Sequence, residues 1–359
     1  MSDLAENDRV PFELKEIARG LLLPLLALLM VGAMLTAMTH GAANLTVGDI
    51  FGIFGRLLTA APIDDQVAYA IIVEIRLPRI LLGAAVGATL AVAGAVLQAL
   101  FRNPLAEPSI IGVSAGAGAA AVATIVLGTT FGALGSLILY ALPVAAFVGG
   151  FVATMLVVAI ARVGGKTPMT TILLSGIAIA ALGSALMGLM MFMSSDEQLR
   201  SITFWMLGSL GGATWAAIVP ALLIMCMALL LMPLLTHRLN LMLLGEREAS
   251  SLGLNVDQFK YLCVTLVAAG VGAAVAVSGI IGFVGIVVPH LLRMIVGPDH
   301  RILLPASALG GATLLLWADV IARTLAPPAE LPIGVLTALL GAPFFLWLLR
   351  RTAREGMTW

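Results

Sequence analysis

The chain is a succession of long apolar runs joined by short polar connections. A helix needs about 20 apolar residues to cross the roughly 30 Å hydrocarbon layer of a membrane. By that length the pattern predicts ten membrane-spanning helices, of which the eighth is short and contains Pro289. Their approximate limits are 20–39, 80–100, 113–130, 137–161, 169–192, 215–235, 259–278, 281–296, 304–322 and 334–350. One long polar stretch, about 237–257, interrupts the pattern in the middle of the chain.

The composition agrees with a protein that lies in lipid. Of 359 residues, 61% are hydrophobic and 11% are charged, and the mean hydropathy is +1.10. Because these values exceed those of soluble domains, we expect an all-α membrane protein with a single transmembrane domain over 1–359. The formal net charge is zero, which gives no reason to expect nucleic acid as a partner. Cys226 and Cys263 lie inside apolar runs without metal-ligand spacing, so neither a disulfide framework nor a metal site is expected.

Lysine and arginine residues predict which connections face the cytoplasm, because cytoplasmic connections are enriched in them. With the N-terminus inside, fourteen of the 19 lie on the inner side, and the other five lie outside. Those five are Arg56, Arg76, Arg79, Arg200 and Arg323. Ten spans then place both termini in the cytoplasm, together with the N-terminal segment 1–19 and the loop at 237–257. Segment 1–19 has mixed charge, unlike a signal peptide, so we expect the first apolar run to be retained.

Two apolar segments resemble each other at an offset of 185 residues. The stretch GATLAVAGAVLQ at 87–98 matches GAAVAVSGIIGF at 272–283, and Pro104-Leu105 falls on Pro289-His290 at the same offset. The second predicted span runs inward and the seventh runs outward, so the repeat is inverted. The sequence therefore predicts two five-helix halves of opposite topology, which many transporters use to form a pathway. Chance likeness between helices rich in small residues is the alternative.

Two short motifs suggest chemistry that their context does not favour. The GGKT at 164–167 resembles the end of a phosphate-binding loop, but Ile160 stands where that motif requires glycine. The GVSAG at 112–116 matches a hydrolase motif, yet it opens a predicted membrane helix, and Ser114 has no histidine near it at mid-membrane depth. We therefore expect no catalytic residue and no ATP binding by this chain.

Asp319 is the strongest candidate for a carboxylate that couples proton movement to transport, because it lies within a predicted span. It precedes Arg323 by four residues, a spacing that favours a local ion pair on one helical face. A proton-coupled carrier is therefore a remote alternative to the function reached below.

Three blocks of sequence carry a resemblance to a known family. The first is IRLPRILLGAAVGATLAVAGAVLQALFRNPLAEPSIIGVSAGA at 75–117. The second is SGIIGFVGIVVPHLLRMIVGPDHR at 278–301, followed by ADVIAR at 318–323 and AELPIGVLTALLGAPFF at 329–345. The third is LGEREASSLGLNV at 244–256. Together they resemble the permease subunits of type II ABC importers, which take up iron-siderophores, haem and cobalamin, and the resemblance covers nearly the whole chain after about residue 45.

The resemblance implies a ten-helix subunit that works as a homodimer, with the substrate path between the two copies. It also implies two cytoplasmic ATPase subunits, which bind ATP and Mg, and a periplasmic substrate-binding protein. The chain would then be a multi-pass protein of the bacterial inner membrane, surrounded by lipid, with no cofactor of its own. In this family the arginines that match Arg76, Arg79 and Arg323 receive acidic residues of the binding protein, a task that suits the planar fork of arginine.

The resemblance also makes the loop at 237–257 the docking site for the ATPase. Its pattern predicts two short helices, 241–244 and 246–252, separated at Gly245 and stopped by Gly253. Ala249 and Leu252 are expected to share an apolar face that fits a groove on the ATPase. The expected coupling residues are Leu244, Gly245, Glu246, Arg247, Ala249, Leu252 and Gly253.

The substrate is predicted from a shorter stretch. The segment SITFWMLGSLGGATW at 201–215 is more similar to haem permeases than to siderophore or cobalamin permeases. Met187, Met190 and Met191 would give the translocation path a polarisable surface suited to a large flat ligand, although methionines at this spacing also serve as ordinary packing. We therefore expect an importer that moves haem from the periplasm to the cytoplasm by alternating access, with a ferric siderophore or cobalamin as the alternative substrate.

Overall fold

The computed structural model describes residues 12–354, apart from Ala42, Asn44, Asp64, 129–137 and 327–328. Within these residues the chain is almost entirely helical, and the single β-bridge joins Val163 to Lys166. The long helices are α1 Phe12–Thr39, α4 Leu77–Phe101, α5 Val113–Gly128, α6 Ile138–Ala161, α7 Met169–Phe192, α9 Trp215–Leu231, α12 Val256–Ser278, α13 Val284–Val296, α14 His300–Thr324 and α15 Ile333–Arg354. The short ones are α2 Val47–Leu58, α3 Gln66–Tyr69, η1 Ala70–Arg76, η2 Pro108–Ile111, α8 Asp196–Leu207, η4 Met232–Leu235, α10 Thr236–Leu244 and α11 Glu246–Ser251.

The helices agree with the ten predicted spans. In the described residues, seven helical segments are long and apolar enough to cross a membrane, and three shorter apolar helices occupy the other predicted positions. The second span starts much earlier than predicted, at Gln66, because α3, η1 and α4 follow one another without a break. The predicted ends at 130 and 137 lie outside the described residues, as does most of the N-terminal segment 1–19.

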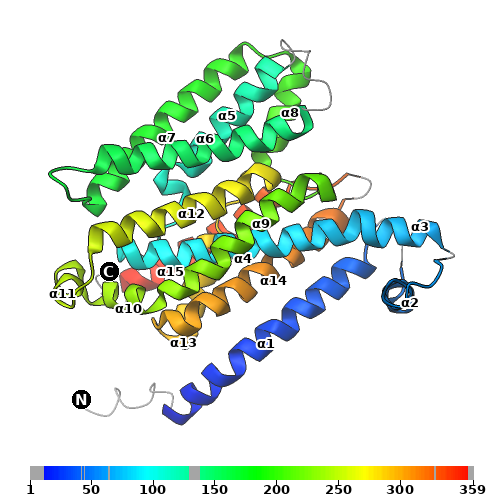
Figure 1. Cartoon of the computed structure of the whole chain (residues 1–359), viewed down its shortest axis with the longest axis horizontal. Coiled ribbons are helices and arrows are strands. Elements are labelled where there is room, and N and C mark those ends of the chain that lie inside the picture. The colour runs from blue at the N-terminus through cyan, green and yellow to red at the C-terminus, as the bar shows by residue number, and fades with distance from the viewer. Residues whose placement is uncertain are drawn as a thin grey trace.

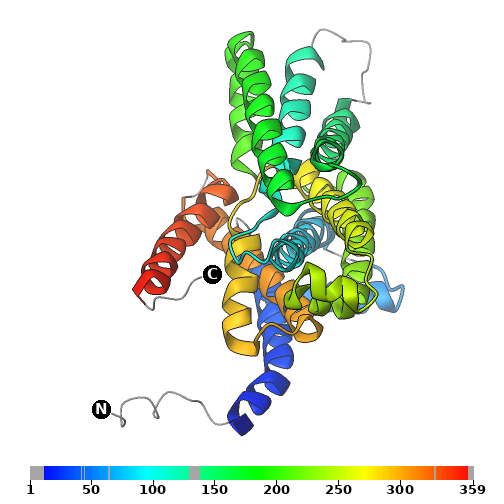
Figure 2. The same ribbon diagram turned by 90° about the vertical axis from the view of Figure 1, so that its left-hand side faces the viewer.

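Helix α4 is the centre of the bundle, and it packs against α9, α12, α13 and α14 (Figure 1). Small residues permit this close packing. A Cβ added at Gly94 would lie 1.9 Å from the carbonyl oxygen of Gly285 in α13, and one at Gly87 would lie 2.2 Å from that of Gly311 in α14. Helices α5, α6 and α7 form a second group, which is joined to the α4 group through α12 (Figure 2).

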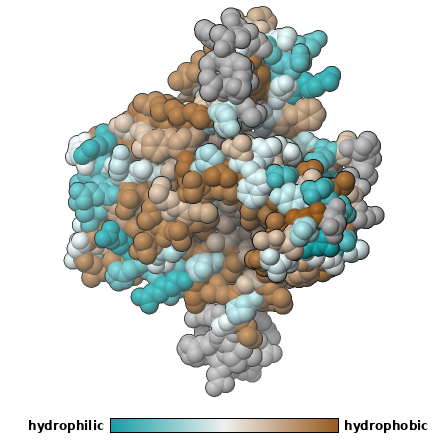
Figure 3. Space-filling model, turned by 45° about the vertical axis from the view of Figure 1, so that its right-hand side comes forward, coloured by the Kyte–Doolittle hydropathy of each residue, from teal (hydrophilic) through white to brown (hydrophobic). Residues whose placement is uncertain are grey.

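The bundle has two distinct ends. The starts of α1, α12 and α14, the helices α10 and α11 and the end of α15 lie together at one end, whereas α2, α3 and α8 lie at the other (Figure 1). Arg56, Arg76, Arg79, Arg200 and Arg323, the five predicted outer arginines, belong to elements of the α2–α8 end. The sidedness predicted from charge therefore agrees with the structure, while the assignment of the α10–α11 end to the cytoplasm stays a prediction. Figure 3 shows apolar side chains across the middle of one face, with hydrophilic side chains toward both ends.

The two segments that resemble each other at an offset of 185 residues differ in conformation at their ends. Residues 87–98 lie wholly within α4. The matching stretch 272–283 leaves the helix after Ser278, because Gly279 at φ +69° ends α12 and Phe283 is also left-handed. In the two similar segments, helix is therefore aligned with helix only as far as Ser278, and the inverted repeat stays a prediction.

Candidate functional site

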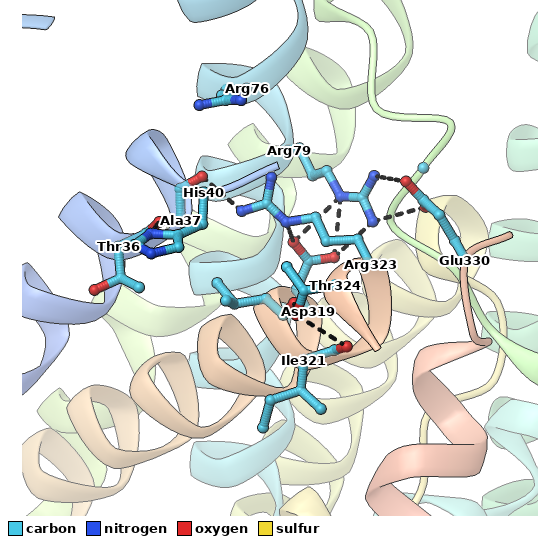
Figure 4. A network of polar contacts seen from close by, with 12 residues as sticks. Thr36, Ala37, His40, Arg76, Arg79, Asp319, Ile321, Arg323, Thr324 and Glu330 are labelled. Atoms are coloured by element: carbon cyan, nitrogen blue, oxygen red, sulfur yellow. Dashed lines mark hydrogen bonds and ion pairs between the residues drawn. The ribbon is translucent and has the colours of Figure 1, made fainter. Parts of the chain in front are cut away.

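A network of arginines and carboxylates lies at the α2–α8 end, where α4 begins and α14 ends (Figure 4). Arg79, in the first turn of α4, donates from Nε and Nη2 to Asp319 of α14 at 2.9–3.2 Å. Its Nη1 and Nη2 also donate to Glu330, in the loop before α15, at 3.0 and 2.9 Å. Arg323 Nε lies 3.5 Å from Asp319 Oδ2. The guanidinium of Arg79 therefore binds two carboxylates that are far from it in the sequence, and the guanidinium of Arg323 lies beside one of them.

Arg76 and Arg323 also stabilise the end of α1. The guanidinium of Arg76 donates to the carbonyl oxygens of Met38 and Ala43, and Arg323 donates to that of Ala37. The last carbonyl groups of a helix have no partner within the helix and carry its negative dipole end. The two arginines thus satisfy acceptors at the end of the first span.

The structure brings together the three arginines that were predicted to receive the binding protein, but it leaves them little exposed. Arg76 is 4% exposed, and the side chains of Arg79 and Arg323 are 13% and 8% exposed. Each of these guanidinium groups has acceptors within the fold, and the docking of a binding protein on them stays a prediction. The local pair of Asp319 with Arg323 was predicted from their spacing, and it is present, although Arg79 is the nearer partner.

Glu330 is the member of the network that sequence reasoning missed. Its side chain is 46% exposed, so it is the most accessible acid of the network. Hydrogen bonds from Arg79 lower the pKa of this carboxyl, and its partial burial opposes them. The sequence feature that could have indicated Glu330 is that it is the single acidic residue in the AELPIG block, shortly after Arg323.

The second candidate site is the helical pair α10 and α11 at the opposite end. Two helices separated at Gly245 and followed by Gly253 were predicted, and the structure confirms them, with α10 beginning five residues earlier than expected. Gly245 has φ +125°, and a Cβ there would lie 2.2 Å from Glu248 Oε2, so the break requires glycine.

One predicted feature of this pair is wrong. Ala249 and Leu252 do not share an exposed face, because Ala249 is fully buried against the permease core while Leu252 is 61% exposed. The three-residue spacing assumed a continuous helix, but α11 ends at Ser251 and Leu252 is its C-cap. The apolar side chains presented outward are instead Leu244 and Leu252, on either side of α11.

Two polar clusters attach this pair to the bundle. Asn240 of α10 donates to Asp299 at 2.7 Å and accepts from the backbone N–H of His300 at 3.0 Å, with the His300 ring 2.8 Å away. We call these three residues the α10–α14 clasp. Glu246 of α11 pairs at 2.7 Å with the buried Lys260 of α12. Helix α10 is therefore attached to the start of α14, and α11 is attached to α12, so movement of a short helix would be transmitted to a long one.

The methionines of the predicted path lie at the contact between α5, α7 and α8. Met187 is buried beside Gly118, where an added Cβ would lie 2.8 Å from the sulfur. Most of the Met187 surface is thus used for packing within one subunit, and its place along the path stays a prediction. Met190 and Met191 are half-buried around the same cluster.

The described residues contain no group of three or more histidine, cysteine, aspartate or glutamate side chains that could hold a metal ion. The GGKT segment forms a tight hairpin turn, with Gly164 and Gly165 at φ +59° and +79°. It is a turn between α6 and α7, and α7 begins only at Met169 after Pro168, whereas a phosphate-binding loop leads directly into its helix.

Comparison with known proteins decides the class of this molecule. The FecCD transport family matches residues 26–351. The chain belongs to the FecCD transport family. Among its relatives, the hemin transport system permease protein HmuU of Yersinia pestis is 48% identical over 282 residues, which cover 79% of this chain and 84% of that protein. The cobalamin import system permease protein BtuC of Halobacterium salinarum is 43% identical over 323 residues, which cover 89% of this chain and 85% of that protein.

Two further relatives extend the match over almost the full chain. The vitamin B12 import system permease protein BtuC of Escherichia coli O139:H28 is 40% identical over 335 residues, covering 92% of this chain and 94% of that protein. A solved inward-facing structure of a metal-chelate type ABC transporter has a TM-score of 0.80 at 36% identity, covering 92% of this chain and 98% of that one. This FecCD permease is therefore the multi-pass inner-membrane subunit of a type II ABC importer, whose ATPase is a separate subunit.

Proposed function

We propose that this FecCD permease imports haem from the periplasm to the cytoplasm in an ATP-driven complex. The 48% identity to the hemin permease HmuU is the observation that supports haem most directly. The segment 201–215, which covers most of α8 and the turn before α9, adds support through its resemblance to haem permeases around the family pattern W-x-x-G-S-L. Met190 and Met191 are partly exposed beside this segment, which supports a place for them along the path.

The proposed complex contains two copies of the permease, two ATPase subunits and one periplasmic substrate-binding protein. The ATPases would contact α10 and α11, where Leu244 and Leu252 offer exposed apolar side chains beside the charged Arg247. ATP binding would move these short helices, and the α10–α14 clasp would pass the movement to α14. Because α14 ends at Asp319 and Arg323, the same helix reaches the network at the other end.

Docking of the binding protein would proceed by exchange of carboxylates at Arg79. In the free permease all three side-chain nitrogens of Arg79 donate to a carboxylate, and Glu330 is the more exposed of its two partners. An acidic side chain of the binding protein would take the place of Glu330, while Asp319 keeps Arg79 in position. Arg76 and Arg323 would supply the surrounding positive potential.

Cobalamin is the second candidate substrate. The two BtuC relatives match 89% and 92% of this chain, against 79% for HmuU, although at lower identity. The deciding experiment reconstitutes the permease with its ATPase and binding protein, and measures ATP hydrolysis with haem, a ferric siderophore or cobalamin. We expect haem to stimulate hydrolysis most, whereas stimulation by cobalamin or the siderophore without any by haem would refute the substrate assignment.

A further inference from the structure

A groove opens between the end of α6 and the start of α12. It encloses about 630 Å³. Its apolar part is formed by Met155, Val158 and Ala159 in the last turns of α6, and its polar part includes Arg162, Asp257 and Tyr261. An apolar channel with a polar mouth matches the two parts of a phospholipid molecule.

The groove lies at the depth of lipid headgroups. On α6, the apolar side chains that are exposed recur every four residues and end beside the groove; they are Val144, Val148, Val152, Leu156 and Ile160. Such a stripe on a membrane-spanning helix faces acyl chains. The groove is beside the last turns of this helix, and Tyr261, 56% exposed, stands at its mouth as tyrosines do at membrane interfaces.

The groove carries one positive and one negative group, and each has unused binding capacity. The Arg162 side chain is exposed and pairs with no other group among the described residues. Asp257 accepts the backbone N–H of Thr167 at 2.8 Å through Oδ1, and Oδ2 has no partner in the described part of the chain. The nearby Lys260 does not neutralise Asp257, since it is buried and pairs with Glu246 at 2.7 Å.

We propose that this groove binds a phospholipid with a primary-amine headgroup, such as phosphatidylethanolamine. The phosphate would bind Arg162, which can hold two of its oxygens, and the ammonium group would bind Asp257. The acyl chains would leave along Met155 and Val158 toward the hydrocarbon layer. An anionic lipid such as phosphatidylglycerol could use Arg162, but Asp257 would then repel it.

Native mass spectrometry of the intact permease, with added phosphatidylethanolamine, phosphatidylglycerol or cardiolipin of matched chains, tests this proposal. We expect the wild type to retain phosphatidylethanolamine preferentially, and Arg162→Gln to weaken its retention about tenfold, because a charge-assisted contact is lost. Asp257→Asn should reverse the preference toward phosphatidylglycerol. The asparagine can still accept the Thr167 N–H, so this variant removes the charge while keeping the hydrogen bond.

Arg301→Gln is the matched control, since Arg301 is an exposed arginine at the same end of the bundle but outside the groove. It should leave the lipid preference unchanged, and thermal unfolding should show that all three variants are folded. The proposal is overturned if the wild type prefers phosphatidylglycerol or cardiolipin, or shows no preference. It is also overturned if Arg162→Gln and Asp257→Asn both keep the wild-type preference.

Discussion

Replacing Glu330 by glutamine tests whether this carboxylate competes with the binding protein for Arg79. The pair is held by two hydrogen bonds of 2.9 and 3.0 Å, and the Glu330 side chain is 46% exposed. Exposed ion pairs contribute about 0.2–1 kcal/mol, and bidentate geometry favours the upper part of that range. If docking must break this pair, Glu330→Gln should tighten binding of the binding protein up to about fivefold at low ionic strength, since 1.4 kcal/mol corresponds to a factor of ten.

The assay is the dissociation constant of the binding protein on the permease in nanodiscs, measured at two salt concentrations. The gain should shrink at high salt because solvent-exposed charges are screened. Glu197→Gln removes the same charge from the same end, in α8, and controls for a general change in potential. Weaker or unchanged docking of Glu330→Gln, with Glu197→Gln equal to wild type, would refute the exchange of carboxylates.

Four further predictions follow from the packing and the two ends of the bundle. Gly94→Val should lower the melting temperature of the permease markedly, because a Cβ there meets the Gly285 carbonyl at 1.9 Å, whereas Gly32→Ala, with open space around it, should not. Asn240→Ala should raise the ATP consumed per substrate transported, since it removes the α10–α14 clasp, with the exposed Ser250→Ala as the control. Leu252→Asp should weaken ATPase binding while the permease stays folded, because Leu252 is exposed. Ala249→Trp should instead destabilise the permease by about 1–3 kcal/mol, as measured by thermal unfolding, because Ala249 is buried. The Arg79–Glu330 pair should stabilise the fold above pH 4.5, and its contribution should be lost as the pH falls through the lowered pKa of Glu330. Thermal unfolding of wild type and Glu330→Gln at several pH values measures this contribution.

The fold could be predicted largely because a membrane span is a local property of sequence. About 20 apolar residues identify a crossing whatever its neighbours are, so the ten spans could be read from the chain. Which end of the bundle faces the cytoplasm stays a prediction. The start of the second span was missed because η1, which leads into α4, contains the charged residues Glu74 and Arg76. A search for apolar runs ends at such residues. Phe283 illustrates a second limit, since no sequence pattern indicated that a non-glycine residue before α13 would adopt a left-handed backbone conformation.

The candidate sites were harder to predict, because burial depends on contacts between distant segments. The spacing of Asp319 and Arg323 revealed their pair, since both lie on one helix. Glu330 is 251 residues from Arg79, and no local pattern connects them. Likewise, Ala249 and Leu252 could be placed three residues apart, but only the tertiary structure determines that one packs inward and the other outward.

The central claim, an ATP-driven permease for haem, is tested most directly by transport itself. The measurement is the initial rate of haem accumulation in proteoliposomes that contain the permease, its ATPase and a haem-loaded binding protein, with ATP and Mg inside the compartment that holds the ATPase. The account predicts uptake that requires ATP and stops when the ATPase is omitted. Haem uptake that continues without the ATPase under a proton gradient alone would contradict it.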